Sequence, residues 1–145
     1  MCGAMKFNVD GSAIGSPGHA GIGGVLRDCN GRVLGSFSKY IGISNAISAE
    51  IAAIHQACVL CSESPALVGK VISIISDSMT AVTWVNGSGF GSFNHINLNY
   101  DIREMLRCLG QTVVIFNSRS SNSFADSLAK RGSSMEGDSV VWEVH

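Results

Sequence analysis

Apolar residues occur in short runs along the chain, separated by glycine-rich or polar segments. Runs of four to eight residues that are rich in β-branched and aromatic side chains predict strands. Asn30-Gly31 lies between two such runs and is a strong hairpin signal. The segment from Gly11 to Gly24 contains six glycines and predicts a turn. The predicted strands are residues 4–10, 21–28, 31–41, 71–76 and 112–116.

Other segments have apolar residues at helical spacing. In the first of them, Ile47, Ile51 and Ile54 recur at intervals of four and three, which places them on one face of a helix. The predicted helices are residues 45–62, 79–86, 96–109 and 124–131. Three strands, a helix, a strand, two helices, a strand and a helix predict an α/β fold with a five-stranded mixed sheet and helices on both faces.

The chain has 145 residues, which is the length of one domain. We expect the domain to span residues 1–132 and residues 133–145 to form a C-terminal tail, in which Trp142 and its apolar neighbours could dock. No apolar run approaches the roughly 20 residues that span a bilayer, and no signal-peptide pattern begins the chain. The sequence therefore predicts a soluble protein without a membrane partner.

The chain contains five cysteines, an odd number in a domain long enough to form its own core. This favours a reducing compartment inside the cell, either the nucleus or the cytoplasm. Cys58 and Cys61 have C-x-x-C spacing, but no second pair of Cys or His stands at zinc-ligand spacing. We interpret them as small buried residues of a helix rather than as a metal or redox site.

The net charge of −1 hides an uneven distribution. If Asp10, Glu50, Asp77 and Asp126 belong to a metal site, ten basic residues against seven remaining acids leave a net charge of +3. The acidic segment after residue 132 accounts for three of those seven acids. A metal-loaded domain would then present a mildly positive surface, which permits binding to nucleic acid.

Three acidic residues stand at positions that suggest a shared site. Asp10 and Asp77 each end an apolar strand, and Glu50 lies at the edge of the apolar stripe of the helix between them. Each has an ordinary explanation, since Asp77 with Ser78 could cap a helix and Glu50 could pair with a basic residue. Together, however, three acids facing one sheet require a counter-charge. A pair of Mg²⁺ ions would supply it and would suit phosphodiester hydrolysis.

Four motifs in order extend this interpretation: NVDGSAIGSPGHAGIGGVLRD with CNGRVLG, SAEIAAI, SDS and NSFADSLAKRG. With these motifs, residues 5–132 resemble the type 1 ribonuclease H family. The resemblance is to the plant reverse-transcriptase-like branch, which is found in retroelements, including retrotransposons, and in free-standing genes. It implies the ribonuclease H-like fold.

The resemblance implies an endonuclease that hydrolyses the RNA strand of RNA–DNA hybrids on four carboxylates: Asp10, Glu50, Asp77 and Asp126. These residues would bind two Mg²⁺ ions, with Mn²⁺ as a substitute. Other domains of a retroelement polyprotein are further candidate partners, and a monomer is expected. The candidate substrate-binding residues are Gly11, Ser12, Asn45, Ser78, Arg119 and Asn122.

The chain departs from the family pattern in one loop and one helix. Phe116 replaces the family's histidine at the end of the fifth strand, and only Arg119 of the following loop remains. Ala46 and Ile47 replace an asparagine pair, and Asn45 stands one step away. An alternative function is therefore a catalytically weakened domain that binds nucleic acid or protein. Another nuclease or an integrase of the same fold, which would cut DNA, is a third interpretation.

Overall fold

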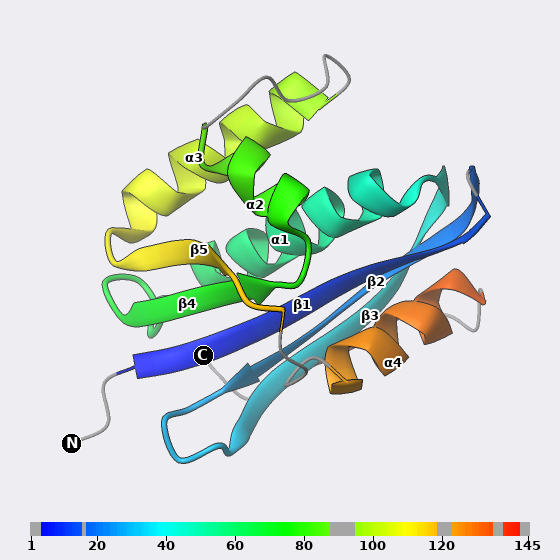
Figure 1. Cartoon of the computed structure of the whole chain (residues 1–145). Helices are drawn as coiled ribbons and strands as arrows, with labels where there is room; N and C mark the ends of the chain where they lie inside the picture. The colour runs from blue at the N-terminus through cyan, green and yellow to red at the C-terminus, as the bar shows by residue number, and fades with distance from the viewer. Residues whose placement is uncertain (1–3, 16, 88–94, 119–122, 135–137, 143–145) are drawn as a thin grey trace.

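The computed structural model describes residues 4–15, 17–87, 95–118, 123–134 and 138–142 (Figure 1). The strands are β1 (Ala4–Gly15), β2 (Gly18–Arg27), β3 (Val33–Ser44), β4 (Val71–Ser76), β5 (Thr112–Phe116) and β6 (Ser139–Trp142). The helices are α1 (Ala46–Ser62), α2 (Met79–Val85), α3 (Ile96–Leu109) and α4 (Ser123–Ser133). The predicted α/β fold and the order of its first nine elements are confirmed.

The strands form one mixed sheet in the order β5-β4-β1-β2-β3-β6. Strands β1, β2, β3 and β6 pair in antiparallel fashion, whereas β4 is parallel to both β1 and β5. Strand β1 lies inside the sheet. In the described sheet it is the only strand with one antiparallel neighbour, β2, and one parallel neighbour, β4. The last residues of β4 lie beside the middle of β1, where Asn8 pairs with Ile75, so residues that follow β4 meet residues in the middle of β1.

Helices cover both faces of the sheet, as predicted. Figure 1 shows α1, α2 and α3 on one face and α4 on the other. The buried apolar core lies mainly between the sheet and α1, and it includes Phe7, Val9, Ile51, Ile54 and Ile74. Burial of each such side chain contributes about 1.5–3 kcal/mol.

The prediction of a turn over residues 11–24 is wrong, because β1 and β2 run through most of this segment. Its glycines serve close packing instead. A Cβ atom at Gly21 would lie 2.1 Å from the Ser133 nitrogen, and one at Gly23 would lie 2.5 Å from the Ala129 nitrogen. Only residues without a side chain allow α4 to approach the sheet this closely. The predicted hairpin at Gly31 is confirmed, with a φ of +83° at that residue.

The structure has a sixth strand, β6, which the five-stranded prediction lacks. Strand β6 pairs with β3, and Trp142 packs over Gly35 and stacks on Phe7 with ring centroids 5.9 Å apart. The Trp142 indole also donates a hydrogen bond to the Ser64 hydroxyl at 2.8 Å. A strand of four residues is too short to show a clear periodicity, so the sequence did not predict it. The residues that Trp142 contacts, Gly35 and Ser64, are distant in the sequence.

Cys58 and Cys61 are buried and have free thiols, as expected for core residues of α1. Burial raises the pKa of each thiol to about 12. Cys29, in contrast, is disulfide-bonded. The expected reducing compartment and the expected monomer stay predictions. Among the described helices, none combines the length and apolar character needed to cross a membrane.

Candidate active site

Three acidic side chains meet where the middle of β1 passes the carboxyl end of β4. The expectation that Asp10 ends its strand is wrong, because β1 continues to Gly15. Asp10 lies on β1, Glu50 on α1 and Asp77 directly after β4, and one carboxylate oxygen from each lies within 4.8 Å of the others. Asp10 is 5% exposed and Glu50 is 7% exposed, whereas Asp77 is exposed. The parallel pairing of β1 with β4 explains the meeting, because Asn8 lies opposite Ile75 and Asp10 is two residues further along. The three acids singled out from the sequence are therefore brought together.

Glu50 reaches the sheet because Gly11 has no side chain. A Cβ atom at Gly11 would lie 2.4 Å from the Ala49 carbonyl carbon and 2.6 Å from the Glu50 nitrogen. The Gly11 N–H donates to Glu50 Oε1 at 2.9 Å and to Asp10 Oδ1 at 3.0 Å. One backbone group thus orients two of the three carboxylates.

Ser76, the last residue of β4, holds the other oxygen of Glu50. Its hydroxyl donates to Glu50 Oε2 at 3.1 Å and accepts a hydrogen bond from the Ser78 N–H at 3.1 Å. The sequence interpretation did not include Ser76. Its signal was a hydroxyl at the buried end of an apolar strand, one residue before a candidate acid.

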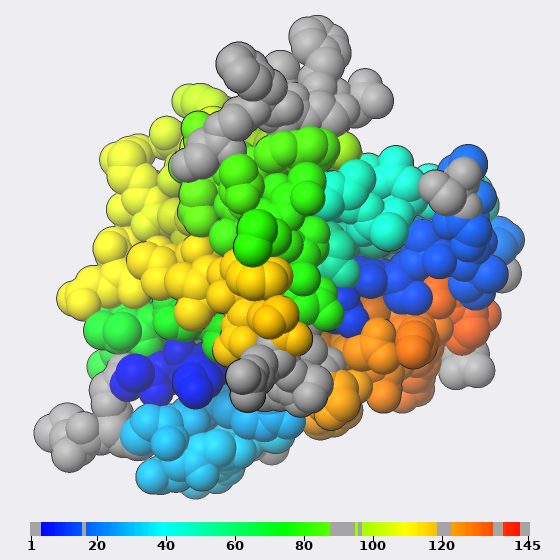
Figure 2. Space-filling view, in the orientation of Figure 1, coloured from blue at the N-terminus to red at the C-terminus, as the bar shows by residue number. Residues whose placement is uncertain are grey.

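Asp126, which only the resemblance brought into the site, lies in the first turn of α4. It shares a side-chain hydrogen bond with Asp10, although its oxygens are not among those within 4.8 Å of one another. Lys130 lies one turn further along α4, and its Nζ is 3.0 Å from Asp126 Oδ2. The i,i+4 spacing is the sequence signal for this pair, which the sequence interpretation missed. Figure 2 shows the end of β1 (blue) at the surface between α1 (cyan) and α4 (orange).

The cluster strongly disfavours ionisation of its central member. Burial, followed by the hydrogen bond and charge of Glu50 and the charge of Asp77, raises the pKa of Asp10 to about 10. Burial also raises the pKa of Glu50, although its hydrogen bonds to Asp10 and to the Gly11 N–H act in the opposite direction. Carboxylates packed in this way retain a proton unless a cation neutralises them.

The pKa of Asp126 shifts in the opposite direction, to below its ordinary value. Partial burial acts to raise its pKa, but the hydrogen bonds from Lys130 and Asp10 and the Lys130 charge together lower it. Asp126 is therefore an ionised carboxylate beside a protonated Asp10. The whole donor set consists of carboxylate oxygens, which are the ligands that Mg²⁺ and Mn²⁺ prefer. The residues fit a hard divalent cation.

Four of the six candidate substrate-binding residues are among the described residues, and they have different structural roles. Asn45 and Ser78 are the N-caps of α1 and α2, and their side chains accept hydrogen bonds from the Ser48 and Ala81 N–H groups at 2.8 and 3.2 Å. Ser12 follows Asp10 by two residues, so both point to the same face of β1. Arg119 and Asn122 lie outside the described residues.

Comparison with known proteins identifies relatives for most of the chain. A model of the reverse transcriptase-like family matches residues 8–132. The Arabidopsis thaliana protein named "Putative ribonuclease H protein At1g65750" is 51% identical over 49 residues. Those residues are 34% of this chain and only 8% of the Arabidopsis protein.

Several solved structures have the same fold. RNase H1 from the archaeon Halobacterium salinarum has a TM-score of 0.80 at 23% identity, over 90% of this chain and 97% of that chain. LC11-RNase H1, which was isolated from compost by a metagenomic approach and crystallised with an RNA/DNA hybrid, has a TM-score of 0.81 at 26% identity, over 90% and 97%. The foamy viral protease-reverse transcriptase in complex with an RNA/DNA hybrid has a TM-score of 0.77 at 25% identity, over 90% of this chain and 20% of that chain.

Proposed function

Since the chain belongs to the reverse transcriptase-like family and has the ribonuclease H fold, we propose that it hydrolyses the RNA strand of RNA–DNA hybrids. The observation that carries this proposal is the meeting of Asp10, Glu50 and Asp77 within 4.8 Å. Two of the similar structures contain RNA/DNA hybrids, which supports this substrate class.

The four carboxylates are the proposed ligands of two Mg²⁺ ions, for which Mn²⁺ can substitute. Bound divalent ions would activate a water molecule and stabilise the leaving oxygen of a phosphodiester. Asp10 is the proposed central ligand, because it lies within 4.8 Å of Glu50 and Asp77 and the Gly11 N–H joins it to Glu50. Glu50 is held in place by Gly11 and Ser76 before any cation arrives, which limits reorganisation on binding.

The residues beside the carboxylates are the proposed contacts to the hybrid. Gly11 and Ser12 continue β1 directly from Asp10, and Ser78 follows Asp77. Backbone and hydroxyl groups at such positions suit the phosphates and 2′-hydroxyls that distinguish RNA from DNA. Asn45, Arg119 and Asn122 remain proposed substrate contacts from the family resemblance.

A larger polypeptide is the proposed context of the domain. The region aligned with the Arabidopsis relative is 8% of that protein's length, and this chain covers 20% of the foamy viral chain. Additional domains in such proteins would supply contacts to the hybrid that this domain lacks. We propose residues 1–132 as the catalytic domain, with residues 133–145 attached to it through β6.

Phe116 favours a second candidate function. It ends β5, is 37% exposed and lies opposite Ser76, at the place where the family resemblance implies a histidine. A phenyl ring cannot transfer a proton or carry charge near the departing product. A domain that binds the hybrid and cleaves it slowly or not at all is therefore the alternative.

Cleavage of an end-labelled RNA–DNA hybrid with Mg²⁺ and then Mn²⁺ separates these functions, with double-stranded RNA and DNA as controls. We expect cuts in the RNA strand of the hybrid alone. Asp10→Asn should lower the rate more than about 100-fold with unchanged circular dichroism, because it removes the central ligand. Asp101→Asn, which removes an exposed acid on α3, is the matched control and should retain activity. Binding without cleavage with either metal would favour the alternative, and DNA-strand cuts would indicate a nuclease of another specificity.

A further inference from the structure

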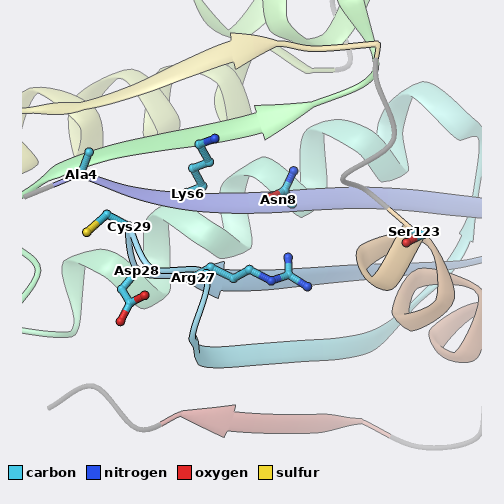
Figure 3. Close-up of a pocket in the computed structure, with 8 residues that line it drawn as sticks. Ala4, Lys6, Asn8, Arg27, Asp28, Cys29 and Ser123 are labelled. Atoms are coloured by element: carbon cyan, nitrogen blue, oxygen red, sulfur yellow. The ribbon is translucent and has the colours of Figure 1, made fainter. Parts of the chain in front are cut away.

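A pocket of about 500 Å³ lies over the first half of β1, on the face of the sheet that α4 packs against (Figure 3). It is lined by the first half of β1, the end of β2 with the following turn, and Ser123 at the start of α4. Its volume falls in the range of sites that bind small ligands or single nucleotide units. The proposed catalytic residues do not line it.

The charge of this pocket is positive. Lys6 is exposed on its wall, and Arg27 extends along it with Cζ 5.9 Å from the centroid of the Phe124 ring. None of the ion pairs found between described residues involves Lys6 or Arg27. The pocket therefore offers two cationic side chains to a ligand.

The one carboxylate in the pocket lining is already engaged. Asp28 pairs with Arg32 at 3.3 Å and accepts hydrogen bonds from the Asn30 and Arg32 N–H groups, both at 2.9 Å. The Arg32 N–H bond, followed by the Asn30 bond and the Arg32 charge, lowers the pKa of Asp28. Figure 3 shows Asp28 pointing away from Lys6 and Arg27. Ser123 adds the positive end of the α4 dipole to the same space. An anionic ligand is favoured.

The position of Lys6 relative to Asp10 indicates which kind of anion the pocket would bind. Lys6, Asn8 and Asp10 alternate along β1 and so point to the same face of the sheet, with Arg27 opposite Lys6 in register. Four strand residues span about 13 Å, and one strand of a duplex advances about 3.4 Å per nucleotide. Because this advance is measured along the helix axis, a duplex whose axis runs parallel to β1 and that places one phosphate at Asp10 would bring a phosphate to Lys6 about four nucleotides away.

We propose that Lys6 and Arg27 form a phosphate-binding subsite for the nucleic-acid backbone, about four nucleotides from the point of cleavage. This inference rests on the proposed function, because the carboxylates define where the scissile phosphate lies. The subsite positions the hybrid through charge and takes no part in the chemical step. It gives the domain a substrate contact that does not depend on the loop around Arg119.

Binding of an RNA–DNA hybrid to Asp10→Asn protein tests the subsite without cleavage. Added Lys6→Ala or Arg27→Ala should each weaken binding about 3- to 10-fold at 50 mM salt. Each should also lower the slope of log affinity against log salt by nearly 1, since one phosphate contact is lost. Lys6→Arg should restore both values. Arg107→Ala removes a charge of the same sign from α3, where Arg107 pairs with Glu104, and should change neither value.

Hybrid length provides the second measurement, with the catalytic residues intact. Lys6→Ala should raise KM for long hybrids and leave kcat unchanged. It should have no effect on hybrids trimmed to fewer than about four nucleotides on one side of the cut. Equal affinity, salt slope and KM in wild-type and Lys6→Ala proteins would overturn the subsite, as would the absence of hybrid binding. If no hybrid is cut but the affinity still depends on Lys6, the proposed function fails and the binding subsite stands.

Discussion

Helices α1 and α4 each bring one acidic residue to Asp10, but they hold it in different ways. Glu50 on α1 is 7% exposed, and hydrogen bonds from Gly11 and Ser76 hold both its oxygens. Asp126 on α4 has a side chain that is 42% exposed and pairs with Lys130, whose own side chain is 67% exposed. A solvated ion pair of this kind contributes about 0–1 kcal/mol. Glu50, held by Gly11 and Ser76, therefore forms a rigid wall of the site. Asp126 with Lys130 forms an adjustable wall.

This difference has a chemical consequence. A buried carboxylate with two fixed oxygens has one geometry, so it defines where a cation can bind. A half-exposed carboxylate can exchange its partners with water and follow changes in the ligand shell. We therefore assign Glu50 the greater part in metal affinity and Asp126 the smaller part.

The largest expected effect is on activity in Glu50→Gln. We expect this variant to lose more than about 100-fold in cleavage rate and to lose the rise in Tm that Mg²⁺ or Mn²⁺ produces, because an amide cannot neutralise the cation. Asp126→Asn should lose about 10-fold and retain part of the metal-induced rise in Tm. Cleavage rates measure the loss of activity, and thermal melts with and without metal measure the loss of the metal-induced rise in Tm. Equal losses in the two variants would remove the distinction between the walls.

Gly11→Ala should disrupt the rigid wall through packing. The added Cβ would lie 2.4 Å from the backbone of α1, so the helix must move away from the sheet. We expect the free energy of unfolding to fall by about 3 kcal/mol, at the upper end for an overpacked core, and activity to fall with it. Urea denaturation measures the change. Ser12→Ala, one residue further along β1, is the control and should shift stability by less than about 1 kcal/mol; a similar loss there would contradict the packing explanation.

The stability of the metal-free protein should fall as pH rises. The folded-state pKa of Asp10 is about 10, above its ordinary value of 3.8, so the folded state binds more protons than the unfolded state. With respect to this group, stability is therefore full below about pH 4 and is lost as pH rises towards 10.

Chemical denaturation in chelator between pH 5 and 9 measures this loss. Asp10→Asn should flatten the pH dependence and raise Tm at pH 8, because a neutral amide avoids the charge repulsion. Saturating Mg²⁺ should flatten it in the unmodified protein. A metal-free profile that rises with pH in this range would show that Asp10 ionises freely.

The smallest effect should come from Lys130→Ala at the adjustable wall. Loss of the Lys130 charge should raise the pKa of Asp126 and change the free energy of unfolding by less than about 1 kcal/mol. We expect a 2- to 3-fold change in the metal concentration that gives half-maximal activity. Lys130→Arg should behave as the unmodified protein does. A loss as large as that of Glu50→Gln would mean that Lys130 has a direct part in the site.

The elements most accurately predicted from sequence are those with strong local signals. The boundaries of β4 and β5 match the predictions, and α3 begins and ends where expected. Prediction failed in the glycine-rich segment, since glycine signals a turn locally but here allows α4 to pack at Gly21 and Gly23. The expected docking of Trp142 is confirmed, but the strand β6 was missed, because the residues on which Trp142 docks, Gly35 and Ser64, lie far away in the sequence.

The chain order alone was enough to indicate an α/β fold and to single out Asp10, Glu50 and Asp77, because apolar periodicity and acids at the edges of apolar runs are local features. Their distances and ionisation states could not be read in the same way. The pKa of Asp10 depends on how closely Glu50 approaches, and that depends on the missing side chain of Gly11 and the hydroxyl of Ser76. Electrostatic coupling varies with distance and burial, and both arise only when the sheet and its helices pack together.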